Sequence, residues 1–157
     1  ERRPVCDGPA VVELAIRSPY RPVAGARSFP FEFRNEGLQV SVQIGDQKVY
    51  ALLDTGCSSP LNFNQKDLQK IPAHSFSHSR THPQKSMGIA GLETSQSGVL
   101  REIRLGDIRI APIEYDSTSS NTESLLGWGA FRKNRMVVDF ENKRVWIEPP
   151  FDASGRQ

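Results

Sequence analysis

An alternation of apolar and polar residues on both sides of a tight turn constrains the fold of this chain most strongly. Residues 38–44 carry an apolar side chain at every second position, Gly45-Asp46 follows, and residues 49–54 continue after the turn. A period of two is typical of a β-strand that buries one face, and a short turn between two such stretches is typical of a hairpin. Because Leu52 and Leu53 are consecutive, we expect the second strand to be buried on both faces near its end.

The same pattern occurs twice more downstream. Residues 98–105 and 108–115 flank a Gly106-Asp107 turn, and residues 136–140 and 144–148 flank a third turn. The tripeptide Leu105-Gly106-Asp107 repeats Ile44-Gly45-Asp46 with one conservative change. This repeat predicts two similar hairpins packed around a pseudo-twofold axis.

The ends of the chain differ from this central region. Prolines crowd the first thirty residues, where the strand pattern is confined to residues 11–17 and to the alternating Phe29, Phe31 and Phe33. We therefore expect an N-terminal proline-rich arm over 1–36 with one or two strands, a folded domain over 37–150 and a flexible tail over 151–157. Helical patterns are limited to residues 64–70 and 128–134. The fold class is therefore expected to be all-β with one or two short helices.

Charge and composition exclude several functions. Twenty basic and eighteen acidic residues give a net charge of +2 and are interspersed, unlike the basic stripe of a nucleic-acid-binding protein. No apolar stretch approaches the roughly 20 residues of a membrane-spanning helix. We expect no nucleic acid partner and no membrane span in this chain. The start at Glu1 and the proline-rich beginning favour a periplasmic or secreted protein, although a cytoplasmic one is also compatible with the sequence.

Two residue types leave alternatives open. Cys6 and Cys57 are too few for a disulfide scaffold and do not have zinc-site spacing. Cys57 is interpreted as a buried thiol, with a disulfide to Cys6 or a role as a nucleophile as the alternatives. All three histidines, His74, His78 and His82, lie four residues apart. The surrounding Ser, Arg and Pro residues favour a solvated loop over a helix with metal ligands, and we expect no metal.

The residues that carry chemistry close the first hairpin. Asp54 directly follows two leucines, so its carboxylate is costly to bury unless it accepts hydrogen bonds. Gly56 permits a tight turn that points backbone N–H groups at the aspartate, and Thr55 adds a hydroxyl. The simplest alternative is an Asx turn with a solvated carboxylate.

Three further segments complete a family resemblance. They are Ser124-Leu125-Leu126-Gly127-Trp128-Gly129-Ala130-Phe131, the stretch 135–147, and the glycine-containing residues 87–92. Together with Leu52-Leu53-Asp54-Thr55-Gly56, they resemble the retropepsin-like aspartic proteases, and bacterial-type members with a single Asp-Thr-Gly in particular. The resemblance covers residues 37–148. It differs from the common pattern at Cys57, Trp128 and Gly129.

The resemblance implies a closed β-barrel or sandwich with a hairpin flap, and it implies a role for each matching residue. Asp54 would be catalytic, and Thr55 and Gly56 would form the active-site loop. Leu126 and Gly127 would support this loop from beneath. The substrate flap would be formed by Gly88, Ile89, Ala90 and Gly91.

The expected reaction is peptide-bond hydrolysis without a cofactor. In such sites two carboxylates share one proton and activate a water molecule. Because the sequence contains one Asp-Thr-Gly, the second carboxylate would come from Asp54 of a homodimer partner. Asp116 and Asp139 are the alternative second acids within one chain. The alternative function is a non-catalytic peptide-binding or scaffold module on the same fold.

Overall fold

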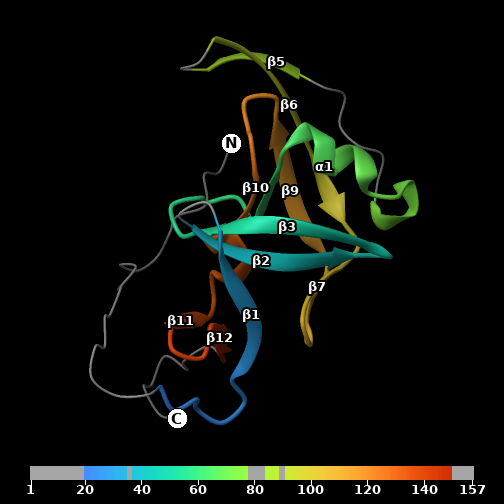
Figure 1. Cartoon of the computed structure of the whole chain (residues 1–157). Coiled ribbons are helices and arrows are strands. Elements are labelled where there is room, and N and C mark those ends of the chain that lie inside the picture. Colours follow the sequence, from blue (N-terminus) through green and yellow to red (C-terminus); the bar gives the residue numbers. More distant parts are fainter. Residues whose placement is uncertain (1–19, 35–36, 78–83, 89–90, 150–157) are drawn as a thin grey trace.

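The computed structural model describes residues 20–34, 37–77, 84–88 and 91–149 (Figure 1). The first half of the chain forms β1 (Arg27–Arg34), β2 (Gly37–Ile44), β3 (Gln47–Asp54), β4 (Leu61–Phe63), α1 (Gln65–Lys70) and the 3₁₀ turn η1 (Ala73–Ser75). The second half forms β5 (Gln84–Gly88), β6 (Gly91–Leu100), β7 (Ile103–Leu105), β8 (Ile108–Ile110), β9 (Ile113–Thr118), β10 (Ser124–Gly127), the 3₁₀ turn η2 (Trp128–Phe131), β11 (Arg135–Asp139) and β12 (Arg144–Glu148). The expected all-β fold is therefore confirmed.

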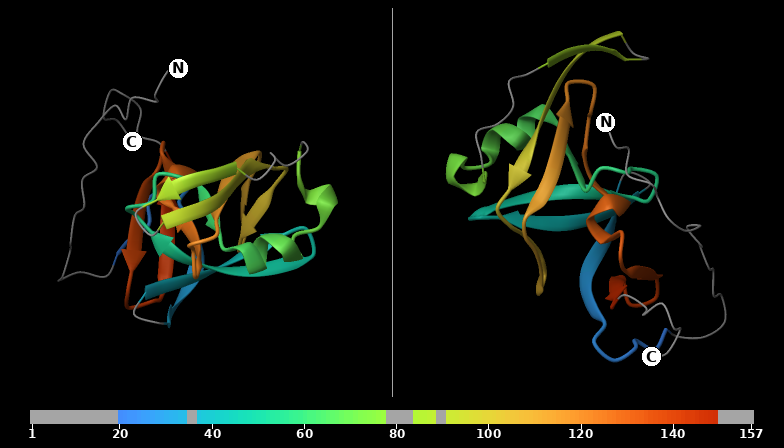
Figure 2. Two further views of the ribbon diagram at one scale, coloured as in Figure 1. Left: turned by 90° about the horizontal axis from the view of Figure 1, so that it is seen from above. Right: turned by 180° about the vertical axis from the view of Figure 1, so that it is seen from behind.

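The strands join in one bent sheet with the order β11-β12-β1-β2-β3-β10-β4-β9-β6-β5, while β7 and β8 pair to the side of this path. The bend lies at β1, whose first half pairs with β12 and whose second half pairs with β2. Figure 2 shows the two parts of the sheet from above and from behind. Within the described residues the two ends of the path, β11 and β5, do not pair with each other, so the sheet is open. Of the predicted arm 1–36, the structure describes 20–34, and β1 in this region lies between β12 and β2.

All three predicted hairpins form. β2 and β3 pair around Gly45, β7 and β8 pair around Gly106, and β11 and β12 pair with each other. The two glycines have nearly the same positive φ, 60° and 57°, a conformation that favours glycine. β6 pairs with β9 in the same register in which β7 pairs with β8. The second predicted hairpin is therefore longer than the β7–β8 pair alone and includes β6 and β9.

The core confirms most of the predicted strand faces and corrects two details. Phe29 and Phe31 are buried as their alternation predicts, but Phe33 is 59% exposed. Leu52 and Leu53 are only half-buried, because β3 reaches the surface where the Asp-Thr-Gly loop begins. The prediction that this strand end is buried on both faces is therefore wrong for the single chain.

The helical segments are short, as expected. Asn64 caps α1, where its Oδ1 accepts a hydrogen bond from the Asp67 backbone N–H at 2.8 Å. The segment predicted as a helix over 128–134 is shorter in the structure, a 3₁₀ turn that ends at Phe131. None of the helices in the described part of the chain is long and apolar enough to cross a membrane. The predicted strand 11–17 and the tail 151–157 lie outside the described residues.

Candidate active site

Asp54 is the last residue of β3, and a parallel neighbour fixes its position. β10 pairs with β3 so that Leu126 lies opposite Leu53 and Gly127 lies opposite Asp54. The other edge of β10 pairs antiparallel with β4. The chain therefore leaves the sheet at Asp54, passes through a loop and returns as β4 with β10 between the two strands. Leu126 is fully buried in the core.

The loop after β3 holds the Asp54 carboxylate in place. The Gly56 backbone N–H donates to Asp54 Oδ1 at 2.8 Å, and the Cys57 N–H donates to the Asp54 carbonyl oxygen at 3.2 Å. Asp54 is half-buried, while Thr55 and Gly56 are exposed. The turn predicted around Gly56 thus forms, and it presents one carboxylate and one hydroxyl side chain at the surface.

Two glycines allow the loop to pack closely against η2 and the end of β10. A Cβ placed on Gly127 would lie 2.0 Å from the Ser59 carbonyl oxygen and 2.6 Å from that of Cys57. A Cβ on Gly129 would lie 2.3 Å from the Ser58 carbonyl oxygen. Real Cβ atoms do not approach this closely, so the loop conformation requires glycine at both positions. In the sequence Gly129 stands out as a departure from the family pattern, and the two glycines of Gly127-Trp128-Gly129 are the signal from which this close packing could be predicted.

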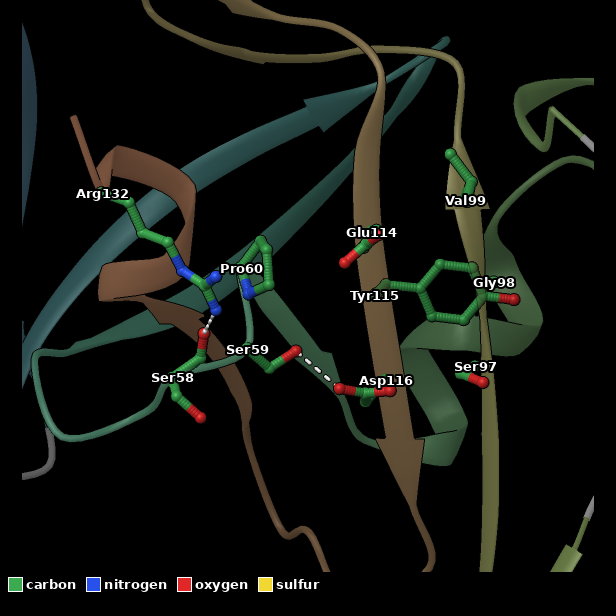
Figure 3. A pocket seen from close by; sticks show the side chains of 10 residues that line it. All are labelled: Ser58, Ser59, Pro60, Ser97, Gly98, Val99, Glu114, Tyr115, Asp116 and Arg132. Carbon is green, nitrogen blue, oxygen red and sulfur yellow. Dashed lines mark hydrogen bonds between the residues drawn. The ribbon is translucent and has the colours of Figure 1, made fainter. Parts of the chain in front are cut away.

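Side chains from distant segments brace the loop (Figure 3). Ser59 Oγ donates to Asp116 Oδ2 at 2.7 Å, and Arg132 Nη2 donates to the Ser58 carbonyl oxygen at 3.2 Å. These residues line a cavity of about 470 Å³ together with residues 97–99 of β6 and 114–116 of β9. No sequence signal could have found the Ser59–Asp116 contact, because the two residues are 57 positions apart.

The structure also locates the two alternative acids. Asp116 accepts the hydrogen bond from Ser59 just described. Asp139 is the last residue of β11, and it accepts hydrogen bonds from the Asn142 backbone N–H and from Asn142 Nδ2 in the turn that follows. These bonds lower the pKa of Asp139 below its ordinary value. The surroundings of Asp139 are those of an aspartate that stabilises a turn.

Cys57 is a free, partly buried thiol within the loop. Its Sγ lies 3.6 Å from the Ser59 carbonyl oxygen. Burial raises the pKa of this thiol, and the negative charges of Asp54 and Asp116 raise it further, so the thiol stays protonated near neutral pH. Cys6 lies outside the described residues, and its pairing with Cys57 stays a prediction.

The segment predicted as the flap forms an antiparallel hairpin. β5 pairs with β6, with Gly88 opposite Gly91, and the tip residues Ile89 and Ala90 lie outside the described residues. The hairpin projects from the rest of the sheet at the top of Figure 1. Its base is tied to the segment after β9, since Thr94 and Ser119 exchange hydrogen bonds of 2.9 Å.

His74 lies in η1, whereas His78 and His82 are outside the described residues. Over residues 20–34, 37–77, 84–88 and 91–149, no three His, Cys, Asp or Glu side chains are grouped so that they could hold a metal ion.

Comparison with known proteins identifies the family. A sequence model of the family described as aspartyl protease matches residues 40–130, which include Asp54, Gly127 and every strand that positions them. The chain belongs to the aspartyl protease family. The crystal structure of a retropepsin-like aspartic protease from Rickettsia conorii is similar to this family member with a TM-score of 0.55 and 15% sequence identity. The similarity covers 79% of this chain and 99% of the other, and at this identity it shows the retropepsin-like fold alone. No curated protein matches the chain.

Proposed function

We propose that this chain is an aspartic endopeptidase in which two Asp54 carboxylates, one from each protomer of a homodimer, activate a water molecule. The position of Asp54 is the observation that supports this proposal most directly. It is the last residue of β3, one of its carboxylate oxygens accepts a hydrogen bond from the Gly56 N–H, and its side chain is only half-buried. A structural aspartate at this position would need neither the accessible carboxylate nor the two close-packed glycines beneath it.

The chemistry follows from two like charges held close together. When two carboxyl groups lie about 3 Å apart, they share one proton because both cannot ionise. The ionised carboxylate takes a proton from the water between them, and the water oxygen attacks the peptide carbonyl carbon. The protonated carboxyl group gives its proton to the carbonyl oxygen as negative charge develops there. The C–N bond then breaks as the amide nitrogen takes up the proton that the first carboxylate received from water, and one hydroxyl of the intermediate returns its proton to the other carboxylate, so that the pair again holds one proton. The rigid loop matters because it fixes the carboxylates before the substrate binds.

The dimer accounts for the second carboxylate. The full sequence has one Asp-Thr-Gly, and Thr55 and Gly56 are exposed in the single chain, as residues at a contact with a second copy would be. We propose that Thr55 joins the two active-site loops. Asp116 is engaged by Ser59 and Asp139 by Asn142, which argues against either as the second catalytic acid.

The proposed substrate is an extended peptide between the active-site loops and the hairpin of β5 and β6. Gly88 and Gly91 flank the tip of this hairpin, and small residues suit a flap that opens to admit a peptide and closes over it. Leu126 and Gly127 would keep the loop at a fixed height beneath the substrate.

A digest of a peptide library, read by mass spectrometry between acidic and neutral pH, tests the activity. Wild-type protein is compared with Asp54→Asn, which removes the ionisable group while preserving its size. The matched control is Asp46→Asn, the same substitution at an exposed turn residue. We expect wild type and the control to cut the same peptides and Asp54→Asn to cut none. Equal cleavage by all three proteins would refute the proposal.

Mixing wild-type and Asp54→Asn protein tests the shared dyad. If activity requires two intact Asp54 residues, randomly exchanged dimers are active in proportion to the square of the wild-type fraction. Independent active monomers would instead give activity proportional to the wild-type fraction itself. A linear dependence after full exchange would refute the dimeric mechanism while leaving an Asp54-dependent protease.

A further inference from the structure

Two stacked phenylalanines lie exposed at the surface of the chain. Phe33 is 59% and Phe140 is 54% exposed, and among the described residues the only other large exposed hydrophobic side chain is Tyr50. The Phe33 and Phe140 rings stack with centroids 6.0 Å apart and an interplanar angle of 17°. Both pack edge-on against the buried Phe31 ring, so they are held against the core although more than half of each side chain is exposed.

This aromatic surface is continuous with the loop that carries Asp54. Phe33 pairs with Leu38 across β1 and β2. Gln39 pairs with Leu52 across β2 and β3, so Leu38 and Leu53 are the next positions along these strands and lie on the same face. Leu38 and Leu53 are both half-buried. We call the surface formed by Phe33, Phe140 and Leu38 the aromatic patch, and it reaches the catalytic loop through Leu53.

The charges beside the patch suit a second copy of the same chain. The turn that carries Phe140 also carries exposed Glu141 and exposed Lys143. In a twofold contact each surface meets itself, so Glu141 of one copy can face Lys143 of the other, and the reverse. A partner of strongly acidic or strongly basic character would gain nothing from this balanced pair.

We infer that the aromatic patch is the surface on which a second copy of this chain docks, and that this contact brings the two Asp54 loops together. The inference rests on the proposed function, which requires two Asp54 residues to meet. It explains why Leu53 and Phe33 are incompletely buried in one chain although their sequence pattern predicts burial. Apolar rings left in water are covered in the dimer.

Sedimentation velocity over a wide concentration range tests the inference. The variants are Phe33→Ser and Phe140→Ser, with Tyr50→Ser as the control. Tyr50 is 46% exposed but lies on the opposite face of β3 from Leu53, beneath the Arg34 guanidinium. Aromatic residues at the centre of an interface commonly contribute at least tenfold to affinity, and each appears twice in a twofold contact. We expect each Phe variant to raise the dimer Kd at least about tenfold, and Tyr50→Ser to leave it unchanged.

The peptide digest of the same proteins separates this inference from the proposed function. The expected result is that the Phe variants lose cleavage at low protein concentration and regain it at high concentration. An unchanged dimer Kd in both Phe variants would refute the proposal that the second copy docks on the aromatic patch, even if cleavage still depends on Asp54. Loss of cleavage with an unchanged Kd would also overturn it, since the rings would then contact the peptide. Cleavage that persists in Asp54→Asn would refute the proposed function instead.

A crosslinking experiment on the wild-type protein tests the same inference if a Phe variant fails to fold. Unlabelled protein is mixed with ¹⁵N-labelled protein, and the mixture is treated with a zero-length crosslinker that joins a carboxylate directly to an amine. We expect crosslinks between Glu141 of one isotope and Lys143 of the other. Their absence in dimeric protein would overturn the inference.

Discussion

Replacing Gly127 with alanine should distort the active-site loop, because the added Cβ would overlap a backbone carbonyl oxygen. The added Cβ would lie 2.0 Å from the Ser59 carbonyl oxygen, where ordinary contact begins at 3.4 Å. The backbone must therefore move by about 1.4 Å to relieve this contact, and the Cys57 carbonyl oxygen, 2.6 Å from the added Cβ, must be displaced as well. Overpacking of this kind costs about 1–3 kcal/mol. For a domain of this size each kcal/mol lowers Tm by about 2–4 °C.

The effect on catalysis should exceed the effect on stability. Gly127 pairs with Asp54 across β10 and β3, so a shifted loop displaces the carboxylate. A displacement of about 1 Å in a catalytic group can cost about 100-fold in rate. We expect Gly127→Ala to keep its fold, to lose several degrees in Tm and to lose about 100-fold in kcat/KM. Scanning calorimetry and a cleavage assay well below Tm measure the two quantities.

A matched control separates loop damage from general destabilisation. Val42→Ala removes volume from the core at a fully buried position on β2, away from the loop. It should lower Tm by a comparable amount and leave kcat/KM near the wild-type value. Wild-type kcat/KM and Tm in Gly127→Ala would refute the reasoning, because the loop would then have room that the structure does not provide.

Two further predictions concern stability alone. Asn64→Ala removes the acceptor for the Asp67 N–H and should cost about 1 kcal/mol, whereas Asn64→Ser keeps a capping oxygen and should cost less; equal Tm values in calorimetry would contradict this. Asp139→Asn tests the pKa that hydrogen bonds from Asn142 lower. Because a depressed carboxyl pKa stabilises the fold only while the group is ionised, the stability advantage of wild type should be present near neutral pH and disappear as the pH falls below about 3.8 and through the lowered pKa. Urea unfolding of both proteins across this range measures the difference, and an advantage that persists at the lowest pH would contradict the assignment.

Local pattern was enough to predict the hairpins. The alternation on both sides of Gly45 and Gly106 specifies strand faces and turn positions, because the side chains of a strand point to opposite faces in turn and only glycine adopts the positive φ of these turns at little cost. The position of the Asp-Thr-Gly at the end of a strand follows from the same pattern. The prediction from this pattern was wrong at Phe33 and Leu53. Both side chains were expected to be buried, and both are partly exposed in the single chain.

The sequence by itself determined the strands, their turns and the identity of the acid that carries the proposed chemistry, since each of these depends on residues within a few positions of one another. Only the tertiary structure decided what surrounds that acid. The insertion of β10 between β3 and β4, the contact of Ser59 with Asp116 and the close approach of Gly127 and Gly129 to the loop all join segments far apart in the chain. Such contacts depend on how whole strands pack, and no local periodicity encodes them.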